Sequence, residues 1–232
     1  MTNNDVYFDA RELPDPINSS VAWIDVMGIR AIMSRSIQIT ANFVFKLHSA
    51  ALEVLPATNT LTLYPVMDGI FVVSEQKTEI LGFLGALLGK IAHTFIGTKE
   101  IQHRFLVKAA LAYGPVIHGS GITTEANQSL GGNAAYKNSL LIGMPMIQVY
   151  QSESKAPPFG IFIHESARAF SPSGETPIPH VWWAWQNKPA TLKSELEIYF
   201  KWCEDHPLKI EYSIDRIKVH KEMVKQYLDD QP

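Results

Sequence analysis

Apolar residues along this chain form two kinds of pattern, short dense runs and longer stretches with helical spacing. The short runs predict buried strands at 21–27, 61–67, 70–74, 105–112 and 159–164. The longer stretches predict helices at 29–54, 79–95, 143–153, 191–204 and 213–228. In the core the order is β-α-β-β-α-β-α-β. Two β-α-β units around a central hairpin predict an α/β (α+β) fold, a ferredoxin-like βαββαβ core with its sheet covered by helices.

Turn and loop residues divide the chain further. The Asp68-Gly69 pair predicts a tight turn between two of the strands. The segment 119–132, rich in Gly, Thr, Ser and Asn, predicts a loop. We expect a polar lead-in at 1–18, one core domain at 19–170, and a C-terminal extension at 171–232 whose two helices pack on the core.

Composition narrows the class of protein. The chain has 232 residues, 46% of them hydrophobic, which is enough for one substantial core. Its net charge of −3 creates no strong field, so neither nucleic acid nor a membrane is expected as a partner. The lone Cys203 excludes an intramolecular disulfide, and no signal pattern opens the sequence, so we expect a cytoplasmic location. Lys90 and His93 interrupt the most apolar stretch, 80–96, which we interpret as a buried helix.

Two of the predicted strands carry an aspartate at a similar place. Asp25 lies near the end of the first strand, and Asp68 lies in the hairpin turn that would pair beside it. Burying an ionised carboxylate is costly unless something compensates, and a bound cation is one such compensation. Taken singly, Asp25 is also read as a cap or a hydrogen-bonded core group, and Asp68 as a plain turn residue. Together they predict a site for Mg²⁺ or Mn²⁺, beside a helix start at Gly28 that can hold phosphate.

Four segments in register then resemble class III nucleotide cyclases. Residues 23–29 resemble the F-x-D-I-x-G-F element of that family, and residues 64–70 resemble its second metal-aspartate hairpin. Residues 107–116 resemble the V-R-x-G-I-x-x-G-P-V strand, and residues 143–153 resemble the G-x-x-V-N-x-A-x-R-L-E helix. The resemblance spans about residues 20–165 and implies the fold, the metal chemistry and a homodimer.

The departures from the family pattern concern base and phosphate recognition. The adenine-reading lysine of adenylate cyclases falls on Tyr64, and the base-reading aspartate falls near Leu140. The transition-state asparagine and arginine fall on Ile147 and Gln151. A purine cyclase of the ordinary kind would therefore lack both its base contacts and its phosphate-stabilising pair.

This combination resembles the bacterial pyrimidine cyclases of the Pycsar antiphage system. Residues 142–145, followed by Tyr150 and Glu153, are similar to the corresponding segment of those proteins. One departure is Lys108, where that family carries an arginine; lysine keeps the charge but lacks the planar fork. The resemblance implies a homodimeric phosphorus-oxygen lyase that converts UTP to cyclic UMP, a messenger for a separate effector protein in antiphage defence. Two alternatives stay open: a cytidylate cyclase, and a degenerate module that binds nucleotide without turnover.

The resemblance also assigns roles to residues. Asp25, Asp68 and the backbone carbonyl of Val26 would hold two divalent ions, Mn²⁺ or Mg²⁺. Four residues would contact the nucleotide: Gly28, Arg30, Tyr64 and Lys108. Three of them have a second reading: Lys108 as a solvated strand lysine, Tyr64 as an ordinary strand residue and Arg30 as an exposed helical arginine.

Overall fold

The computed structural model describes residues 10–57, 60–207 and 212–229. The strands are β1 (Ile17–Val26), β2 (Thr62–Val66), β3 (Gly69–Ser74), β4 (Val107–His118), β5 (Leu141–Gly143), β6 (Ile161–Ile163) and β7 (Trp182–Trp183). The α-helices are α1 (Ile29–Met33), α2 (Ile37–Val54), α3 (Lys77–Gly97), α4 (Gln128–Gly131), α5 (Ala134–Lys137), α6 (Met144–Ser152), α7 (Glu165–Ala169), α8 (Leu192–Asp205) and α9 (Ile214–Asp229). Four 3₁₀ turns complete the described elements: η1 (Ala10–Glu12), η2 (Ile101–His103), η3 (Gly119–Gly121) and η4 (Glu153–Lys155).

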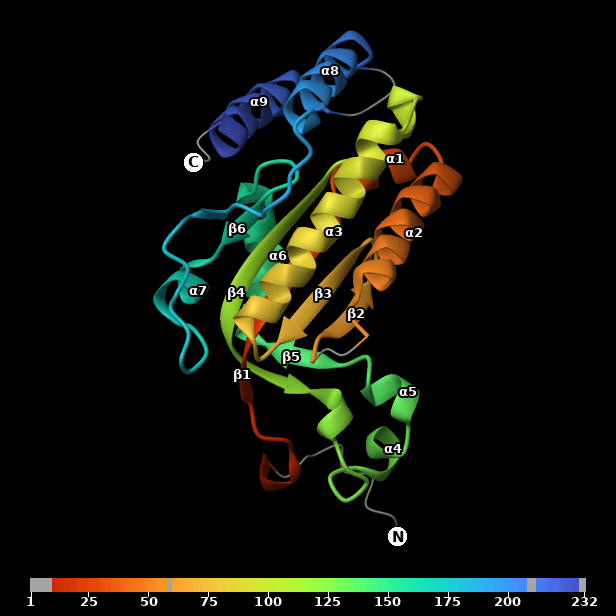
Figure 1. Ribbon diagram of the computed structural model, residues 1–232. Helices are drawn as coiled ribbons and strands as arrows, with labels where there is room; N and C mark the ends of the chain where they lie inside the picture. The colour runs from red at the N-terminus through yellow and green to blue at the C-terminus, as the bar shows by residue number, and fades with distance from the viewer. Residues whose placement is uncertain (1–9, 58–59, 208–211, 230–232) are drawn as a thin grey trace.

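The strands form one mixed sheet in the order β2-β3-β1-β4-β6-β7, with β5 paired to β4 (Figure 1). The pairs β2–β3, β3–β1 and β1–β4 are antiparallel, and β4–β6 is parallel. The predicted strand-helix-strand-strand-helix-strand order is therefore present in β1 to β4. The central place of β1 explains its apolar run, because both of its edges and both of its faces are covered.

Each face of the sheet has its own core. Ala22 and Ile24 of β1 belong to the cluster under α2 and α3, which run side by side across one face (Figure 1). The alternate residues Val21 and Trp23 belong to a second cluster that includes Val149 of α6. Alternation along a strand sends neighbouring side chains to opposite faces, so α6 covers the face opposite α2 and α3.

The predicted helix at 29–54 is two helices, α1 and α2. The break falls on Ser34 and Ser36, whose hydroxyls bond backbone groups. The Ser34 hydroxyl donates to the Ala31 carbonyl (2.7 Å), and the Ser36 hydroxyl accepts from the Ile39 amide (3.3 Å) as the N-cap of α2. Serine side chains compete in this way with the helical ladder, which is why the apolar spacing alone missed the interruption.

Three further boundaries differ from the prediction. Strand β4 runs on to His118, because Tyr113 to Val116 continue to pair with β1. The predicted loop at 119–132 contains η3 and α4, and Asn127 caps α4 by accepting from the Leu130 amide (2.9 Å). The lead-in predicted at 1–18 overlaps the start of β1, and its residues 1–9 lie outside the described residues.

Helix α3 is long and apolar enough to cross a membrane by length and composition. A core helix of a soluble protein passes the same test, and 44% of the apolar window is buried inside the protein. Its buried side chains, among them Leu84, Leu87 and Ile91, belong to the main core. The helix thus packs on the sheet as the sequence predicted.

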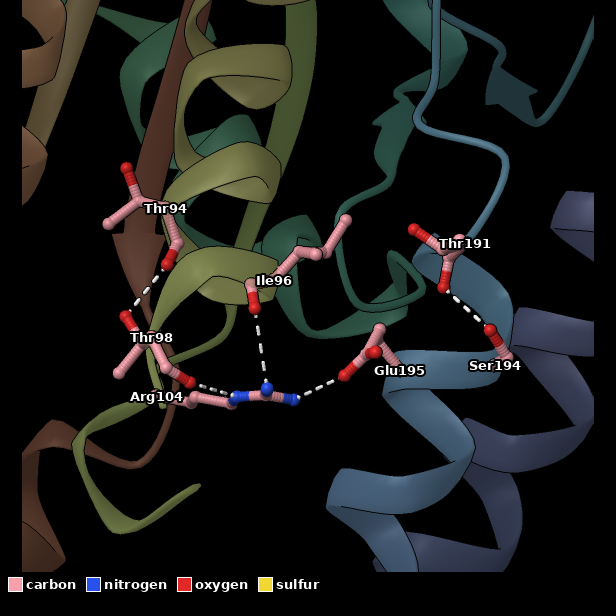
Figure 2. A network of polar contacts seen from close by, with 7 residues as sticks. All are labelled: Thr94, Ile96, Thr98, Arg104, Thr191, Ser194 and Glu195. Carbon is pink, nitrogen blue, oxygen red and sulfur yellow. Dashed lines mark hydrogen bonds and ion pairs between the residues drawn. The ribbon is translucent and has the colours of Figure 1, made fainter. Parts of the chain in front are cut away.

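The C-terminal segment is joined to the sheet and to α3. Strand β7 pairs with β6, and the buried Trp185 donates its indole N–H to the Phe159 carbonyl (2.8 Å). Arg104 makes the second link, as Figure 2 shows. Its guanidinium donates to the Thr98 carbonyl (2.9 Å) and the Ile96 carbonyl (3.4 Å) at the end of α3, and to Glu195 of α8 (2.7 Å). One buried cation therefore satisfies free carbonyls of α3 and holds α8 in place.

Replacing Arg104 by methionine is expected to lower the free energy of unfolding by about 3 kcal/mol, because it leaves buried acceptors unpaired. Denaturant unfolding of the purified protein measures this. Lys193→Met is the matched control, because Lys193 also joins α8 to another element, through Asp229, but at an exposed ion pair. Its loss should be much smaller. Equal losses in the two variants would contradict the role given to Arg104.

Candidate functional site

The predicted aspartates lie at the same end of neighbouring strands. Asp25 is the penultimate residue of β1, and in the sheet it pairs with Gly69 of β3 on one side and Lys108 of β4 on the other. Asp68 directly precedes Gly69, in the β2–β3 turn where Met67 has a positive φ of 51°. The antiparallel pairing of β1 with β3 thus brings the two carboxylates to one end of the sheet, as the sequence predicted.

The Asp25 carboxylate is half-buried and only partly compensated. Its Oδ1 atom is buried and has no hydrogen-bond partner among the described residues. Burial, followed by the negative charges of Asp68 and Glu153, raises the pKa of Asp25 to about 7. A hydrogen bond from the Val26 amide and the charge of Lys108 act in the opposite direction but are weaker. The site therefore places negative charge where water cannot fully solvate it, which favours a bound cation.

Glu153 is a third carboxylate at this site, and the sequence analysis did not assign it there. It opens η4, directly after α6. Burial raises its pKa, Lys108 and Arg216 lower it, and Asp68 raises it further. The signal that could have found it is its place at the end of the predicted 143–153 helix, which packs against β1 and β4.

Lys108 is buried rather than solvated, so its reading as an exposed strand lysine is wrong. Its side chain is 4% exposed, and burial lowers its pKa despite the nearby Glu153 and Asp25. The ammonium lies 3.0 Å from His220 Nε2 and donates to the Ser154 carbonyl at 3.4 Å. A buried ammonium beside carboxylates is suited to bind a further anion such as phosphate.

His220 belongs to α9, so the C-terminal helix reaches the site. Burial, then the charges of Lys108 and Arg216, lowers the pKa of His220 to about 3, which keeps the ring neutral. Its Nε2 atom then accepts from the Lys108 ammonium, and its Nδ1 atom hydrogen-bonds the Tyr212 hydroxyl.

The other residues predicted for the site are Val26, Gly28, Arg30 and Tyr64, and they differ in burial and in hydrogen bonding. Val26 is buried beside Asp25, Gly28 caps α1 with φ 73°, and Arg30 is exposed on α1. Tyr64 is 3% exposed, and its hydroxyl is already paired with His118 Nδ1 at 2.6 Å. Its proposed contact with a base therefore requires the His118 pairing to be shared or broken, and that role stays a prediction.

A small cavity lies between the β1–α1 turn and the C-terminal helices. Its volume is about 50 Å³. Backbone and side chains from both sides line it, including Gly28, Arg104, Tyr212, Arg216 and His220. The cavity thus connects the helix start that the sequence assigns to phosphate with the guanidinium of Arg216 on α9.

The residues present fit a divalent cation only in part. The unpartnered Asp25 Oδ1, with Asp68 and Glu153 close enough to raise its pKa, supplies hard oxygen donors. Among the described residues, however, no three His, Cys, Asp or Glu side chains come together closely enough to hold a metal ion by themselves. Mg²⁺-type sites commonly use one or two carboxylates and take their other ligands from water and substrate phosphates. The donor set fits that open kind of site.

Comparison with known proteins gives a likeness in structure alone. No protein-family model matches the chain, and no curated protein matches it. The chain is structurally similar to guanylyl and adenylyl cyclase domains of class III. The guanylyl cyclase domain of the RhoGC fusion protein from the aquatic fungus Blastocladiella emersonii is 16% identical, with a TM-score of 0.46 over 66% of this chain and 84% of that one.

Two other solved structures are similar to the same extent. The guanylate cyclase domain of RhGC from Catenaria anguillulae, in complex with GTP, is 15% identical, with a TM-score of 0.46 over 66% of this chain and 81% of that chain. The adenylate/guanylate cyclase/hydrolase from Silicibacter pomeroyi is 12% identical, with a TM-score of 0.46 over 64% and 76%.

Proposed function

We propose that this protein is a metal-dependent pyrimidine nucleotide cyclase that converts UTP to cyclic UMP and pyrophosphate. The observation that supports it most directly is the buried, unpartnered Oδ1 of Asp25, at a sheet end shared with Asp68 and facing the buried Lys108. Carboxylates that hold metal and a cation for phosphate are the parts that phosphoryl transfer requires.

Each residue has a defined task in this reaction. Asp25 and Asp68, with the Val26 carbonyl, would hold two divalent ions that acidify the ribose 3′-hydroxyl and neutralise the triphosphate. Lys108 and Arg30 bind phosphate oxygens, and the Gly28 turn leaves room for them at the start of α1. The 3′-oxygen attacks the α-phosphorus, its proton passes to solvent, and the bond to the leaving pyrophosphate breaks. The rate gain comes mainly from positioning and charge stabilisation.

Tyr64 is proposed to select a single-ring base, because it stands where adenylate cyclases carry a lysine. A cytidylate cyclase is the alternative substrate choice, since UTP and CTP differ at one edge of the base. A module that binds nucleotide without turnover is the second candidate function. It is favoured by Ile147, which lacks the amide expected at its position, and by Gln151, which lacks the guanidinium expected at its position.

The surface of β5 and α6 offers a place where a second copy of the chain could bind. On β5 and α6, Ile142, Met144, Ile147 and Tyr150 are 61%, 59%, 51% and 55% exposed, an unusual apolar density for one short segment. We propose that this segment contributes to a homodimer, which sedimentation of the purified protein measures directly.

The cyclic product would act in the cytoplasm on a separate effector protein in antiphage defence.

The deciding experiment incubates the purified protein with each of the four ribonucleoside triphosphates and Mn²⁺, followed by identification of the products. Cyclic UMP should form fastest, and a chelator in excess over Mn²⁺ should stop the reaction. A preference for CTP would replace UTP by the alternative substrate. Absence of cyclic product from all four nucleotides, with nucleotide still bound, would leave the binding module and overturn the cyclase.

A further inference from the structure

Helix α9 is fixed at the edge of the nucleotide site by a buried contact. His220 is 6% exposed, and its ring accepts from the Lys108 ammonium at 3.0 Å. Lys108 in turn pairs with Asp25 in the register of β1 and β4. Figure 1 places α9 with α8 at the end of the sheet that also carries α1. The C-terminal helix is therefore attached to the residues that the proposed reaction uses.

One turn before His220, Arg216 is exposed and lines the cavity that also borders Gly28. Its guanidinium makes no hydrogen bond and no ion pair within the described part of the chain. Its charge nevertheless acts on Glu153, Lys108 and His220. The guanidinium is thus near the site but held by no partner there.

Glu153 is a negative charge that acts on both Lys108 and Arg216, but within the described residues it forms an ion pair with neither. Lys108 is held by neutral acceptors, His220 and the Ser154 carbonyl, and no carboxylate of the described residues lies within ion-pair distance of it. Arg216 adds a second positive charge that lowers the Lys108 pKa. A triphosphate carries several negative charges and presents oxygens to which a guanidinium can donate in a bidentate manner.

We propose that Arg216 of the C-terminal helix binds the phosphates of the substrate together with Lys108, so that the extension completes the nucleotide site. This rests on the proposed function and adds a phosphate-binding residue from outside the segment that resembles the cyclase core. In the resemblance to class III cyclases, the family's transition-state arginine falls on Gln151, which has no guanidinium. Arg216 would supply a guanidinium to the same site.

The test uses the full-length protein and a ligand that needs no turnover. Binding of inorganic triphosphate in the presence of Mn²⁺ is measured by calorimetry for the wild type, Arg216→Gln and Arg216→Lys. The glutamine variant should bind about ten- to one-hundred-fold more weakly, as expected for a lost charge-assisted hydrogen bond, and lysine should restore part of the affinity. In the cyclase assay the KM for the nucleotide should rise by a similar factor.

Lys218→Gln is the matched control, because Lys218 is an exposed cation two residues away on the same helix. It should leave both triphosphate affinity and KM unchanged. Thermal unfolding should also be unchanged in Arg216→Gln, since the side chain is exposed. Equal effects of the two glutamine variants, or wild-type affinity in Arg216→Gln, would overturn the inference. So would a wild type that binds no triphosphate. Triphosphate binding that depends on Arg216 in a protein without cyclase activity would uphold the inference while the cyclase proposal fails.

Discussion

Replacing Asp25 by asparagine is expected to abolish Mn²⁺-dependent nucleotide turnover and, at the same time, to stabilise the metal-free protein above pH 7. Turnover is lost because the amide keeps the shape of the side chain but removes the charge and one hard oxygen ligand. Product formation from UTP and Mn²⁺ measures the loss. Near-normal turnover in the variant would contradict the role of Asp25 in holding metal.

The gain in stability follows from the pKa of Asp25. Folding raises this pKa from 3.8 to about 7, mainly through burial, so between these values the folded protein keeps a proton that the unfolded chain has released. The contribution of Asp25 to the stability of the metal-free protein therefore falls as pH rises from about 4 to 7 and is then level. The buried His220 acts in the opposite direction, because its pKa is lowered from 6.5 to about 3, so the Asp25 contribution is measured as the difference between the wild type and Asp25→Asn. The penalty above pH 7 is at most about 4 kcal/mol, from roughly 1.4 kcal/mol per pKa unit. Asparagine removes it, so the variant should be the more stable protein at pH 8, with no such advantage at pH 4.

Thermal unfolding at several pH values, with and without Mn²⁺, checks both parts. Mn²⁺ should raise the melting temperature of the wild type and not that of Asp25→Asn, because a ligand that binds only the folded state stabilises it. Asp15→Asn is the control, since Asp15 is exposed and lies ahead of β1. It should change neither the pH profile nor the Mn²⁺ effect. A stability difference between Asp25→Asn and the wild type that does not grow from pH 4 to pH 7 would contradict the account of Asp25.

Replacing Gly69 by alanine is the second change with a large expected effect. A Cβ atom at this position would lie 2.4 Å from two ring carbons of Trp23 and 2.6 Å from the Ile24 carbonyl oxygen. The Trp23 ring cannot easily move, because it is 2% exposed and packs on Phe71 with ring centroids 4.4 Å apart. Relief of the clash must therefore separate β3 from β1. We expect a loss of about 3 kcal/mol in the free energy of unfolding, at the upper end for overpacking of a core.

The same substitution should reduce turnover, because Gly69 pairs with Asp25 and follows Asp68. Denaturant unfolding and the UTP assay measure the two effects. Gly82→Ala is the control: it lies inside α3 and a Cβ there meets nothing within 4 Å. Alanine is the better helix former by up to about 1 kcal/mol, so this variant should be as stable as the wild type or more stable. Unchanged stability in Gly69→Ala would show that the strands accommodate the methyl group.

Local patterns were sufficient for most of the fold. The dense apolar runs predicted β1, β3 and the first half of β4, because a central strand must be apolar on both faces. The Asp68-Gly69 pair predicted a turn between β2 and β3. The observed turn lies one residue earlier, at Met67 and Asp68, with the positive φ on Met67 and Gly69 as the first residue of β3. The apolar runs and the predicted turn were together sufficient to place Asp25 and Asp68 at one end of the sheet. The apolar spacing did not predict the break between α1 and α2. That break depends on the hydroxyls of Ser34 and Ser36, which form hydrogen bonds with backbone groups.

Tertiary structure alone decided what surrounds the two aspartates. Lys108 and His220 are 112 positions apart, and no periodicity in either segment indicates that they touch. The same holds for Tyr64 and His118. Their hydrogen bond uses the Tyr64 hydroxyl, which was predicted to contact a base. Spacing along a chain reports which face of an element a residue lies on, because helix and strand periods are local properties. Which faces then pack together depends on the burial and charge of distant segments, and here that packing brought Glu153, Arg216 and His220 to the site.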